Sequence, residues 1–379
     1  MTPPVAALLA PKPPPTAFHR RRPARQREGA IGWLHHHLFS SIGNTVLTLA
    51  IVALVIWLIP PFIDWAFIDA VWHGTTREAC VDAHGACWPF ITQRFGQIIY
   101  GFYTYEERWR PDVVYLFGAI GLAWLMIPKL PRKSWVGIFM LTAYPLVSFI
   151  LLSGGWFGLP VVSTERWGGL LLTLVVAAVG IVASLPLGIL LALGRRSELP
   201  VVRILCVVFI EVWRGVPMIT VLFMASSMLP LFLPDGFEFD KLVRALIAVA
   251  LFNAAYMAEV VRAGLQALPK GQYEGAAALG LSYWRTTILI VLPQALRIVL
   301  PGIVNNMISM FKDTSLVSII GFFDVLGVIQ AGATDVDWTT PNTALTGYLF
   351  AGVLFWVFCF SMSRYSAALE NDLAKGDRR

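Results

Sequence analysis

Long apolar runs alternate with short polar segments over most of the 379 residues. The runs are continuous instead of alternating residue by residue, so they fit helices and not the strands of a membrane β-barrel. Most are close to the ~20 residues that a helix needs to cross a bilayer. The pattern predicts an all-α polytopic membrane protein with about eight transmembrane helices, at residues 44–60, 113–127, 135–152, 168–193, 216–233, 242–261, 288–310 and 345–362.

Two stretches do not fit a single straight span. Residues 200–233 are too long for one perpendicular crossing, so an interfacial or tilted first part is expected before the crossing begins near Val216. Residues 315–329 are apolar but short, and they are expected to form one partly embedded helix.

Composition agrees with this class of protein. Hydrophobic residues make up 57% of the chain and charged residues only 14%, far from the mixture found in soluble domains. The formal net charge is +6, but the basic residues lie in short stretches beside the apolar runs, as the positive-inside rule expects. The charge therefore predicts membrane orientation, with both termini in the cytoplasm, and no nucleic-acid binding is expected.

The segment before the first span has no apolar core. Residues 1–43 are proline-rich at first and then basic, which predicts a disordered cytoplasmic tail. The first apolar run lies deep in the chain and is long enough to span. No cleavable signal peptide is therefore expected.

Residues 68–111 carry charges of both signs without a basic excess, which is typical of a periplasmic loop. Cys80 and Cys87 lie close together in this loop and allow two interpretations, a disulfide formed in an oxidising compartment or two unpaired thiols. Only His73 and His84 are near them. No metal site is predicted, because no further His or Cys partners lie nearby.

Two sets of polar residues lie in or beside the spans of the second half of the chain. The first recurs at three-residue steps and shares one face of the sixth span. The second follows the seventh span, which Pro293 and Pro301 are expected to break. Polar groups inside a membrane usually face a cavity or a partner helix, so each set allows a substrate pathway or helix–helix contacts, and the charges of the second can also neutralise each other. The sets are Asn253, Tyr256 and Glu259, then Lys312, Asp313 and Ser315.

Oppositely charged residues three positions apart share a helix face and can pair. This spacing favours an ion pair between Glu211 and Arg214 near the cytoplasmic interface, with a transport role for these two charges as the alternative, and it allows another pair between Glu259 and Arg262 at the inner end of the sixth span.

The chain becomes small and polar after the sixth span. Residues 271–278 are expected to form a short helix with Glu274 in its first turn, where a carboxylate favours the helix dipole. Gly280 stands where a left-handed residue would end that helix, and Ser282 is expected to cap the next one, which starts at Tyr283. The run of small residues leaves a low ridge that another protein can approach closely. The segment therefore predicts a docking site.

These residues carry a resemblance to a known family. The pattern E-x-A-A, then Gly280, then Leu292-Pro293 resembles the cytoplasmic coupling loop of membrane subunits in binding-protein-dependent ABC importers. The sequences AYMAEVVRAGLQALPKGQYEGAAALGLS, RGVP and KDTSLVSIIG are similar to the polar-amino-acid permeases of that superfamily. One departure is Gly275, which replaces the usual first Ala and weakens the helix slightly.

The resemblance covers residues 161–379 and implies a five-helix type I permease core with a coupling loop at 265–286. The three-span extension, residues 44–160, is similar to larger permeases of general L-amino-acid importers. The implied location is the bacterial inner membrane. The implied partners are a second homologous permease, two ATPase subunits that bind ATP and Mg, a periplasmic binding protein and an L-amino-acid substrate. The implied coupling residues are Lys270, Gly271, Glu274, Ala276, Ala277, Gly280 and Ser282.

No Walker-type phosphate-binding motif is present in the sequence. The chain is therefore expected to be a transporter subunit that is not itself an enzyme and binds no cofactor, with ATP hydrolysis in a separate partner. The alternative is a stand-alone ion-coupled secondary amino-acid transporter, which would predict an internal repeat, and no convincing repeat is found. A non-transporting scaffold or sensor would make the intramembrane charges incidental.

Overall fold

The structure is a computed structural model that describes residues 30–127, 129–232, 234 and 239–376. These residues form helices, and the strand-like pairing among them is limited to isolated bridges. The chain divides into two units, Met1–Asp64 and Trp65–Arg379. The prediction of disorder for residues 1–29 lies outside the described residues.

The first unit contains two helices, α1 (Ala30–Leu38) and α2 (Ile42–Ile63). The predicted disorder is wrong for α1, which is helical up to Leu38. Ser41 caps α2 because its side chain accepts a hydrogen bond from the Asn44 backbone N–H at 3.2 Å. None of the α2 residues is buried, as expected for a helix that exposes apolar side chains to lipid.

Among the described residues, four helical stretches are long and apolar enough to cross a membrane, and up to seven if each bent pair counts as one span. The four are Ile42–Ile68, Gly169–Arg195, Lys241–Ala267 and Thr343–Glu370. Helix α5 (Trp109–Met126), which contains the second predicted span, is not among them, and its first turn carries Arg110 and Asp112. The prediction of a polytopic all-α membrane protein is confirmed, with four to seven candidate spans where about eight were predicted.

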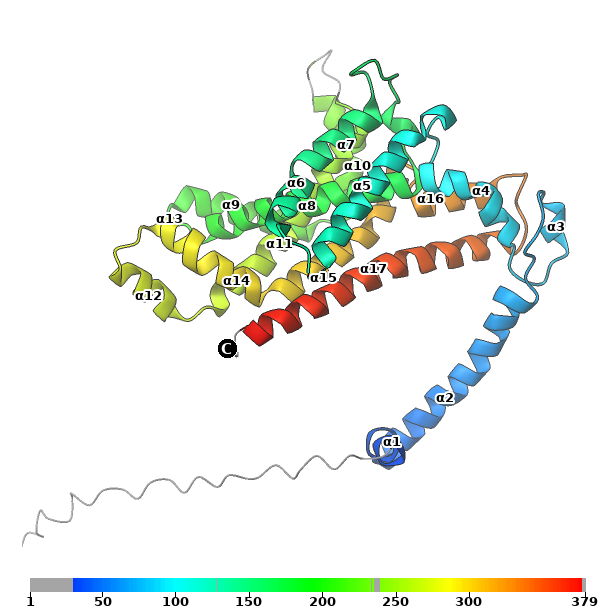
Figure 1. Ribbon diagram of the computed structural model, residues 1–379, viewed down its shortest axis with the longest axis horizontal. Coiled ribbons are helices and arrows are strands. Elements are labelled where there is room, and N and C mark those ends of the chain that lie inside the picture. Colours follow the sequence, from blue (N-terminus) through cyan, green and yellow to red (C-terminus); the bar gives the residue numbers. More distant parts are fainter. Residues whose placement is uncertain (1–29, 128, 233, 235–238, 377–379) are drawn as a thin grey trace, which may run out of the picture. The chain divides into compact units, whose positions relative to one another are not determined.

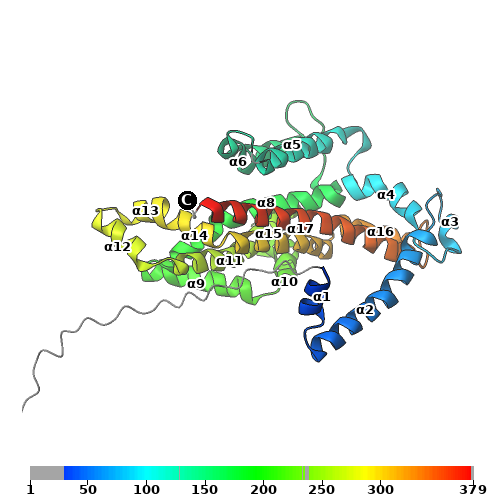
Figure 2. The same cartoon turned by 60° about the horizontal axis from the view of Figure 1, so that its bottom comes forward.

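Two long helices, α8 (Gly169–Arg195) and α11 (Lys241–Ala267), pack side by side in the centre of the second unit. Figures 1 and 2 show them flanked by α9 (Pro200–Gly215), α14 (Leu292–Ile298) and α15 (Leu300–Asp313). A Cβ atom added at Gly188 would lie 2.7 Å from the Cβ of Met257 and 3.0 Å from the Ala258 backbone nitrogen. Glycine therefore permits the two backbones to approach this closely.

Two spans are broken where proline interrupts the backbone hydrogen bonds. Helix α9 (Pro200–Gly215) and the helical stretch Met218–Phe232 meet at 104°, with Pro217 in the break. The latter stretch contains α10 (Met218–Phe223), η5 (Met224–Met228) and η6 (Leu229–Phe232). This confirms that residues 200–233 do not form one straight span.

The second break lies between α14 (Leu292–Ile298) and α15 (Leu300–Asp313), where the two parts of the predicted seventh span meet at 64°. A 3₁₀ helix, η8 (Thr314–Ile320), follows and ends at Gly321, which has φ 81°. Helix α16 (Val325–Thr334) then starts separately, capped by Asp324. The prediction of one helix over residues 315–329 is therefore wrong, because the left-handed glycine and the new cap interrupt it.

The predicted loop 68–111 contains helical structure. It includes α3 (Glu78–Val81) and α4 (Trp88–Tyr100), and α4 buries Phe90 and Ile98. Helix α4 packs against α8, α16 and α17 (Thr343–Gly376). Cys80 and Cys87 form a disulfide with their Cα atoms 5.7 Å apart. The segment is therefore a folded part of the second unit.

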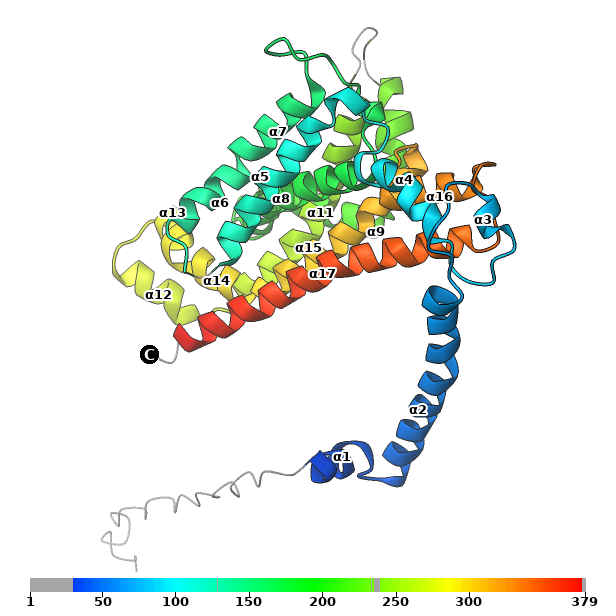
Figure 3. The same cartoon turned by 45° about the vertical axis from the view of Figure 1, so that its right-hand side comes forward.

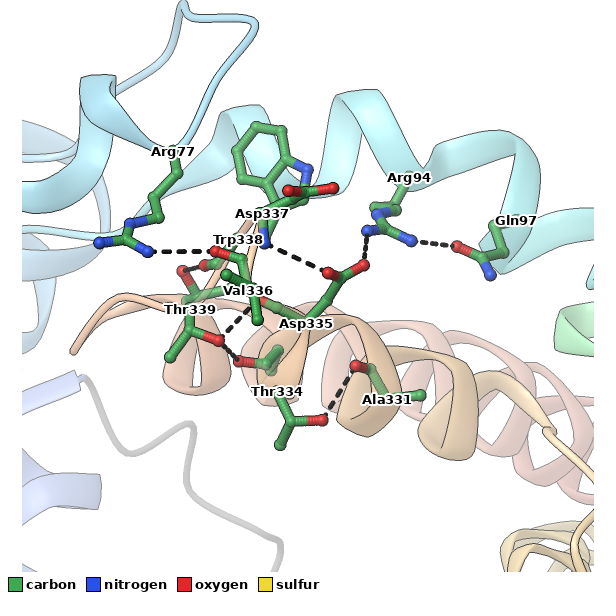
Figure 4. A network of polar contacts seen from close by, with 12 residues as sticks. Arg77, Arg94, Gln97, Ala331, Thr334, Asp335, Val336, Asp337, Trp338 and Thr339 are labelled. Atoms are coloured by element: carbon green, nitrogen blue, oxygen red, sulfur yellow. Dashed lines mark hydrogen bonds and ion pairs between the residues drawn. The ribbon is translucent and has the colours of Figure 1, made fainter.

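Figure 4 shows how this segment holds the connection between α16 and α17. Arg94 of α4 forms an ion pair with Asp335, and Arg77 donates to the carbonyl of Val336 at 3.1 Å. The backbone N–H of Asp337 and the Arg94 guanidinium lower the pKa of Asp335. The Cys87 backbone N–H donates to Thr346 Oγ1 of α17 at 2.8 Å. The disulfide-bonded segment thus holds the start of α17 in place through these hydrogen bonds and the ion pair.

Helices α5, α6 (Lys133–Leu141) and α7 (Ala143–Ser153) pack against one another, as Figure 3 shows. The α6 and α7 helices are bent by 41° and correspond to the third predicted span. Arg110, fully buried at the start of α5, donates to the carbonyl of Pro160 at 2.9 Å and lies 2.7 Å from Glu107. The buried guanidinium therefore joins α5 to the chain that enters the core.

A Gly188→Ala substitution tests the close contact of α8 and α11. The added methyl group meets backbone and Cβ atoms that cannot rotate away, so we expect a loss of about 1–3 kcal/mol in the free energy of unfolding. The measurement is thermal unfolding of the purified protein in detergent. The control is Gly352→Ala, where a Cβ has no atom within 4 Å; equal stability of the two variants would contradict the account.

Candidate functional site

The polar segment after α11 forms a short helix, α12 (Lys270–Ala278), with Pro269 at its N-cap. The helix starts at Lys270, so Glu274 lies in its second turn and the predicted placement in the first turn is wrong. The favourable effect of the helix dipole is confined to the first turn. The Glu274 side chain is exposed and is available to a partner.

The end of α12 is a Schellman turn. Gly280 has φ 71°, its N–H donates to the Ala277 carbonyl at 2.9 Å, and the Leu281 N–H donates to the Ala276 carbonyl at 3.1 Å. This confirms the left-handed helix stop predicted at Gly280. Ser282 is the N-cap of α13 (Tyr283–Thr286), but its side chain makes no capping hydrogen bond, so that part of the prediction is wrong.

The predicted coupling residues divide into an outer face and an inner face. Ala276 is 2% exposed and packs inward, so it is not part of an exposed ridge. Gln294 of α14 donates from Nε2 to Oε1 of Gln272 in α12 at 3.1 Å. This hydrogen bond joins α12 to the broken seventh span. The outer, exposed face holds the other six, Lys270, Gly271, Glu274, Ala277, Gly280 and Ser282.

Three large apolar residues beside the turn were missed by the sequence reasoning. Leu279 is 78% exposed, and Tyr283 and Trp284 are 58% and 59% exposed. Apolar residues that flank a helix-stop glycine in an otherwise polar segment are the signal that could have identified them. Together with the outer face of α12, they form an exposed patch suited to a protein partner.

A cluster of charged residues joins the ends of α8, α9 and α11. Glu259 accepts a hydrogen bond from Arg195 at 2.7 Å, lies 2.8 Å from Arg262 Nη2, and lies 3.9 Å from Arg214. The predicted Glu259–Arg262 pair is confirmed. Glu211 pairs with Arg195 at 3.0 Å, so the predicted Glu211–Arg214 pair is wrong.

The other members of the first polar set have partners in the fold. The Arg214 guanidinium lies 5.6 Å from the ring centroid of Tyr256, within cation–π distance. Asn253 is 4% exposed, and its side-chain amide donates to the Val249 carbonyl of the same helix at 3.0 Å. The α11 set therefore makes contacts within and between helices.

The second polar set lies beside a hollow. Lys312 and Ser315 line a space of about 270 Å³ together with Leu326, Tyr348 and Phe355. The Ser315 hydroxyl donates to the Lys312 carbonyl at 3.0 Å. Tyr348, on α17, is a lining residue that the sequence reasoning missed, since nothing in the sequence aligns α17 with α15.

The two polar sets remain separate. Within the described part of the chain, no ion pair joins Lys312 to Asp313, and no hydrogen bond or ion pair links the α11 set to the second set. The described residues also contain no group of three or more His, Cys, Asp or Glu side chains that could hold a metal ion.

Broken spans, an exposed turn between two membrane helices and a charged cluster beside it define a membrane-embedded transporter subunit. Residues 184–375 match the family of binding-protein-dependent transport system inner membrane components, and the chain belongs to this family. It is a multi-pass protein of the inner membrane and the membrane component of such a system.

Two relatives match nearly the whole chain. The inner membrane amino-acid ABC transporter permease protein YhdY of Escherichia coli K12 is 52% identical, over 94% of this chain and 97% of YhdY. The glutamate/glutamine/aspartate/asparagine transport system permease protein BztC of Rhodobacter capsulatus is 38% identical, over 98% of each. A crystal structure of an amino acid ABC transporter with histidines has 28% identity and a TM-score of 0.46, over 54% of this chain and 92% of that one.

A Glu259→Gln substitution tests the charged cluster. Removal of the carboxylate leaves three neighbouring guanidinium groups without their common anion, so we expect a loss of about 2 kcal/mol in stability at low salt. The control is Glu211→Gln, whose side chain is 54% exposed and pairs with Arg195 alone; we expect about 0–1 kcal/mol for it. Thermal unfolding in detergent measures both, and a loss no larger at Glu259 than at Glu211 would refute the central role of Glu259.

Proposed function

We propose that this chain is the permease subunit of an ATP-driven importer of L-amino acids. The observation that carries the proposal is the 52% identity with an amino-acid permease across 94% of the chain, which includes the exposed turn at α12. Family membership supports this function and gives no support to a stand-alone ion-coupled transporter.

The proposed complex contains a second homologous permease, two ATPase subunits that bind ATP and Mg, and a periplasmic amino-acid-binding protein. No phosphate-binding motif occurs in this chain, which supports ATP hydrolysis in a partner. Both termini lie in the cytoplasm in this proposal, and residues 68–111 lie in the periplasm. The disulfide in that segment is compatible with an oxidising compartment.

The outer face of α12 and the turn after it would enter a cleft of the ATPase. Lys270, Glu274 and Ser282 provide polar contacts, while Leu279 and Trp284 provide exposed apolar area. The left-handed conformation at Gly280 holds the two helices of the turn at a fixed angle. Closure of the ATPase subunits on ATP would then displace the turn and the spans attached to it as a rigid body.

For the substrate pathway, we propose Lys312, Asp313 and Ser315, of which Lys312 and Ser315 line the hollow. A zwitterionic amino acid needs a cation for its carboxylate, and Lys312 is an exposed cation at the hollow. Asn253, Tyr256 and Glu259 were candidates from the sequence. Their partners within the fold favour a structural role for these three residues.

The test of this function is reconstitution of the chain with the products of the neighbouring genes in liposomes. Substrate-loaded binding protein should stimulate ATP hydrolysis inside the complex and drive uptake of amino acids. Uptake by the chain alone under an ion gradient, without an ATPase partner, would reject the proposal.

A Glu274→Lys substitution tests docking through α12. The substitution places a positive charge opposite the ATPase group that faced the Glu274 carboxylate. Like charges across an interface cost several kcal/mol, so we expect at least about tenfold weaker association with the ATPase. The control is Glu198→Lys, which reverses another exposed carboxylate, in the connection between α8 and α9. Co-purification and uptake measure the effect, and equal association of both variants would rule out this docking face.

A Lys312→Gln substitution tests the pathway. Loss of a charge-assisted hydrogen bond to the substrate carboxylate should raise the KM for uptake about tenfold, with basal ATP hydrolysis unchanged. Lys129→Gln is the matched control, since Lys129 is also exposed and does not line the hollow. Wild-type KM in the Lys312 variant would exclude a role for this cation in binding.

A further inference from the structure

Two consecutive arginines at the end of α8 hold different parts of the molecule. Arg195, the last residue of α8, bonds Glu211 of α9 and Glu259 of α11. Arg196, its C-cap, donates from Nη1 to the Leu265 carbonyl and to the Tyr273 hydroxyl, both at 3.1 Å. One side chain therefore ties α8 to its neighbouring helices, and the next ties it to α12.

The Leu265 carbonyl needs these donors for a reason visible in the sequence. A helical carbonyl normally accepts the N–H of the residue four positions later. That residue is Pro269, which has no N–H. Leu265 is 2% exposed, so water does not replace the missing donor freely. Arg196 donates to this carbonyl, and the Tyr273 hydroxyl approaches it at 3.4 Å.

Tyr273 brings α12 into the same contact. Its side chain lies in the second turn of α12 and packs against the apolar cluster that includes Leu265, Leu268 and Val261. The Arg196 guanidinium lies 5.6 Å from the centre of the Tyr273 ring. A planar guanidinium both stacks on an aromatic ring and donates in fixed directions, which a lysine ammonium does not reproduce.

We propose that Arg196 and Tyr273 form a positioning pair that transmits displacement of α12 to α8. The inference rests on the proposed function, because α12 must be the element that the ATPase moves. Three elements meet at one guanidinium: the end of α8, the end of α11 and the second turn of α12. Arg195 then passes the movement of α8 to α9 and α11 through Glu211 and Glu259.

The experiment uses the full complex in liposomes, with Arg196→Gln and Tyr273→Phe in this chain. The quantities measured are co-purification with the ATPase, ATP hydrolysis with and without loaded binding protein, and amino acid taken up per ATP. In Arg196→Gln, two hydrogen bonds from a charged donor are lost, so we expect about tenfold less uptake per ATP while assembly and basal hydrolysis persist. Tyr273→Phe, which removes one hydroxyl and keeps the ring, should give a smaller loss.

Three further variants separate a coupling role from a structural one. Arg203→Gln removes an exposed arginine of α9 and should leave uptake per ATP unchanged. Arg196→Lys keeps the positive charge but loses the planar guanidinium with its fixed donor directions, so its uptake per ATP should be as low as that of Arg196→Gln. The double variant Arg196→Gln with Tyr273→Phe should be no worse than Arg196→Gln alone, since the two residues act through one contact.

The outcomes distinguish this inference from the proposed function. Unchanged uptake per ATP in both Arg196→Gln and Tyr273→Phe overturns the positioning pair and leaves the importer function intact. Loss of ATPase binding in both variants also overturns it, because the pair would then only stabilise the fold of α12. Absence of ATP-driven uptake in the wild-type complex rejects the proposed function and, with it, the coupling role of the pair.

Discussion

The close contact between α8 and α11 is the constraint on which the second unit depends. Lipid tails are as apolar as the side chains that face them, so helices in a membrane associate through close van der Waals packing and not through the hydrophobic effect. Gly188 permits that approach, with backbone of α11 at contact distance. Helices α4, α9, α14, α15 and α16 then pack on one or both members of the pair. Their positions follow from this central contact.

Prolines at the breaks and ends of the spans shape the fold through hydrogen bonds and not through close packing. Proline removes a backbone donor, and the freed carbonyl must find another partner inside a membrane protein. At Pro269 the partners are a guanidinium from α8 and a hydroxyl from α12. The Leu265 carbonyl, which lacks its helical donor, thus links α8, α11 and α12. The bend of 104° before α10 is likewise placed by Pro217.

The charged groups are concentrated where the long helices end. Four arginines and two glutamates join α8, α9, α11 and the start of the exposed turn, so these elements are held together electrostatically as well as by packing. The disulfide-bonded segment plays a comparable part at the start of α17 through Arg94 and Arg77. The hollow beside Lys312 is lined by residues of α15, η8, α16 and α17.

The sequence by itself determined the features that depend on near neighbours along the chain: the apolar spans, the separate first part of residues 200–233, the left-handed stop at Gly280 and the family. Tertiary structure decided the partners of side chains. Spacing placed Glu211 and Arg214 on one helix face, yet Arg195, from another helix, lies closer to Glu211. The sequence likewise did not indicate that α4 is buried, because the helices that pack against it, α8, α16 and α17, are distant along the chain. Local rules fix backbone conformation, whereas long side chains pair with whichever helix the packing brings near.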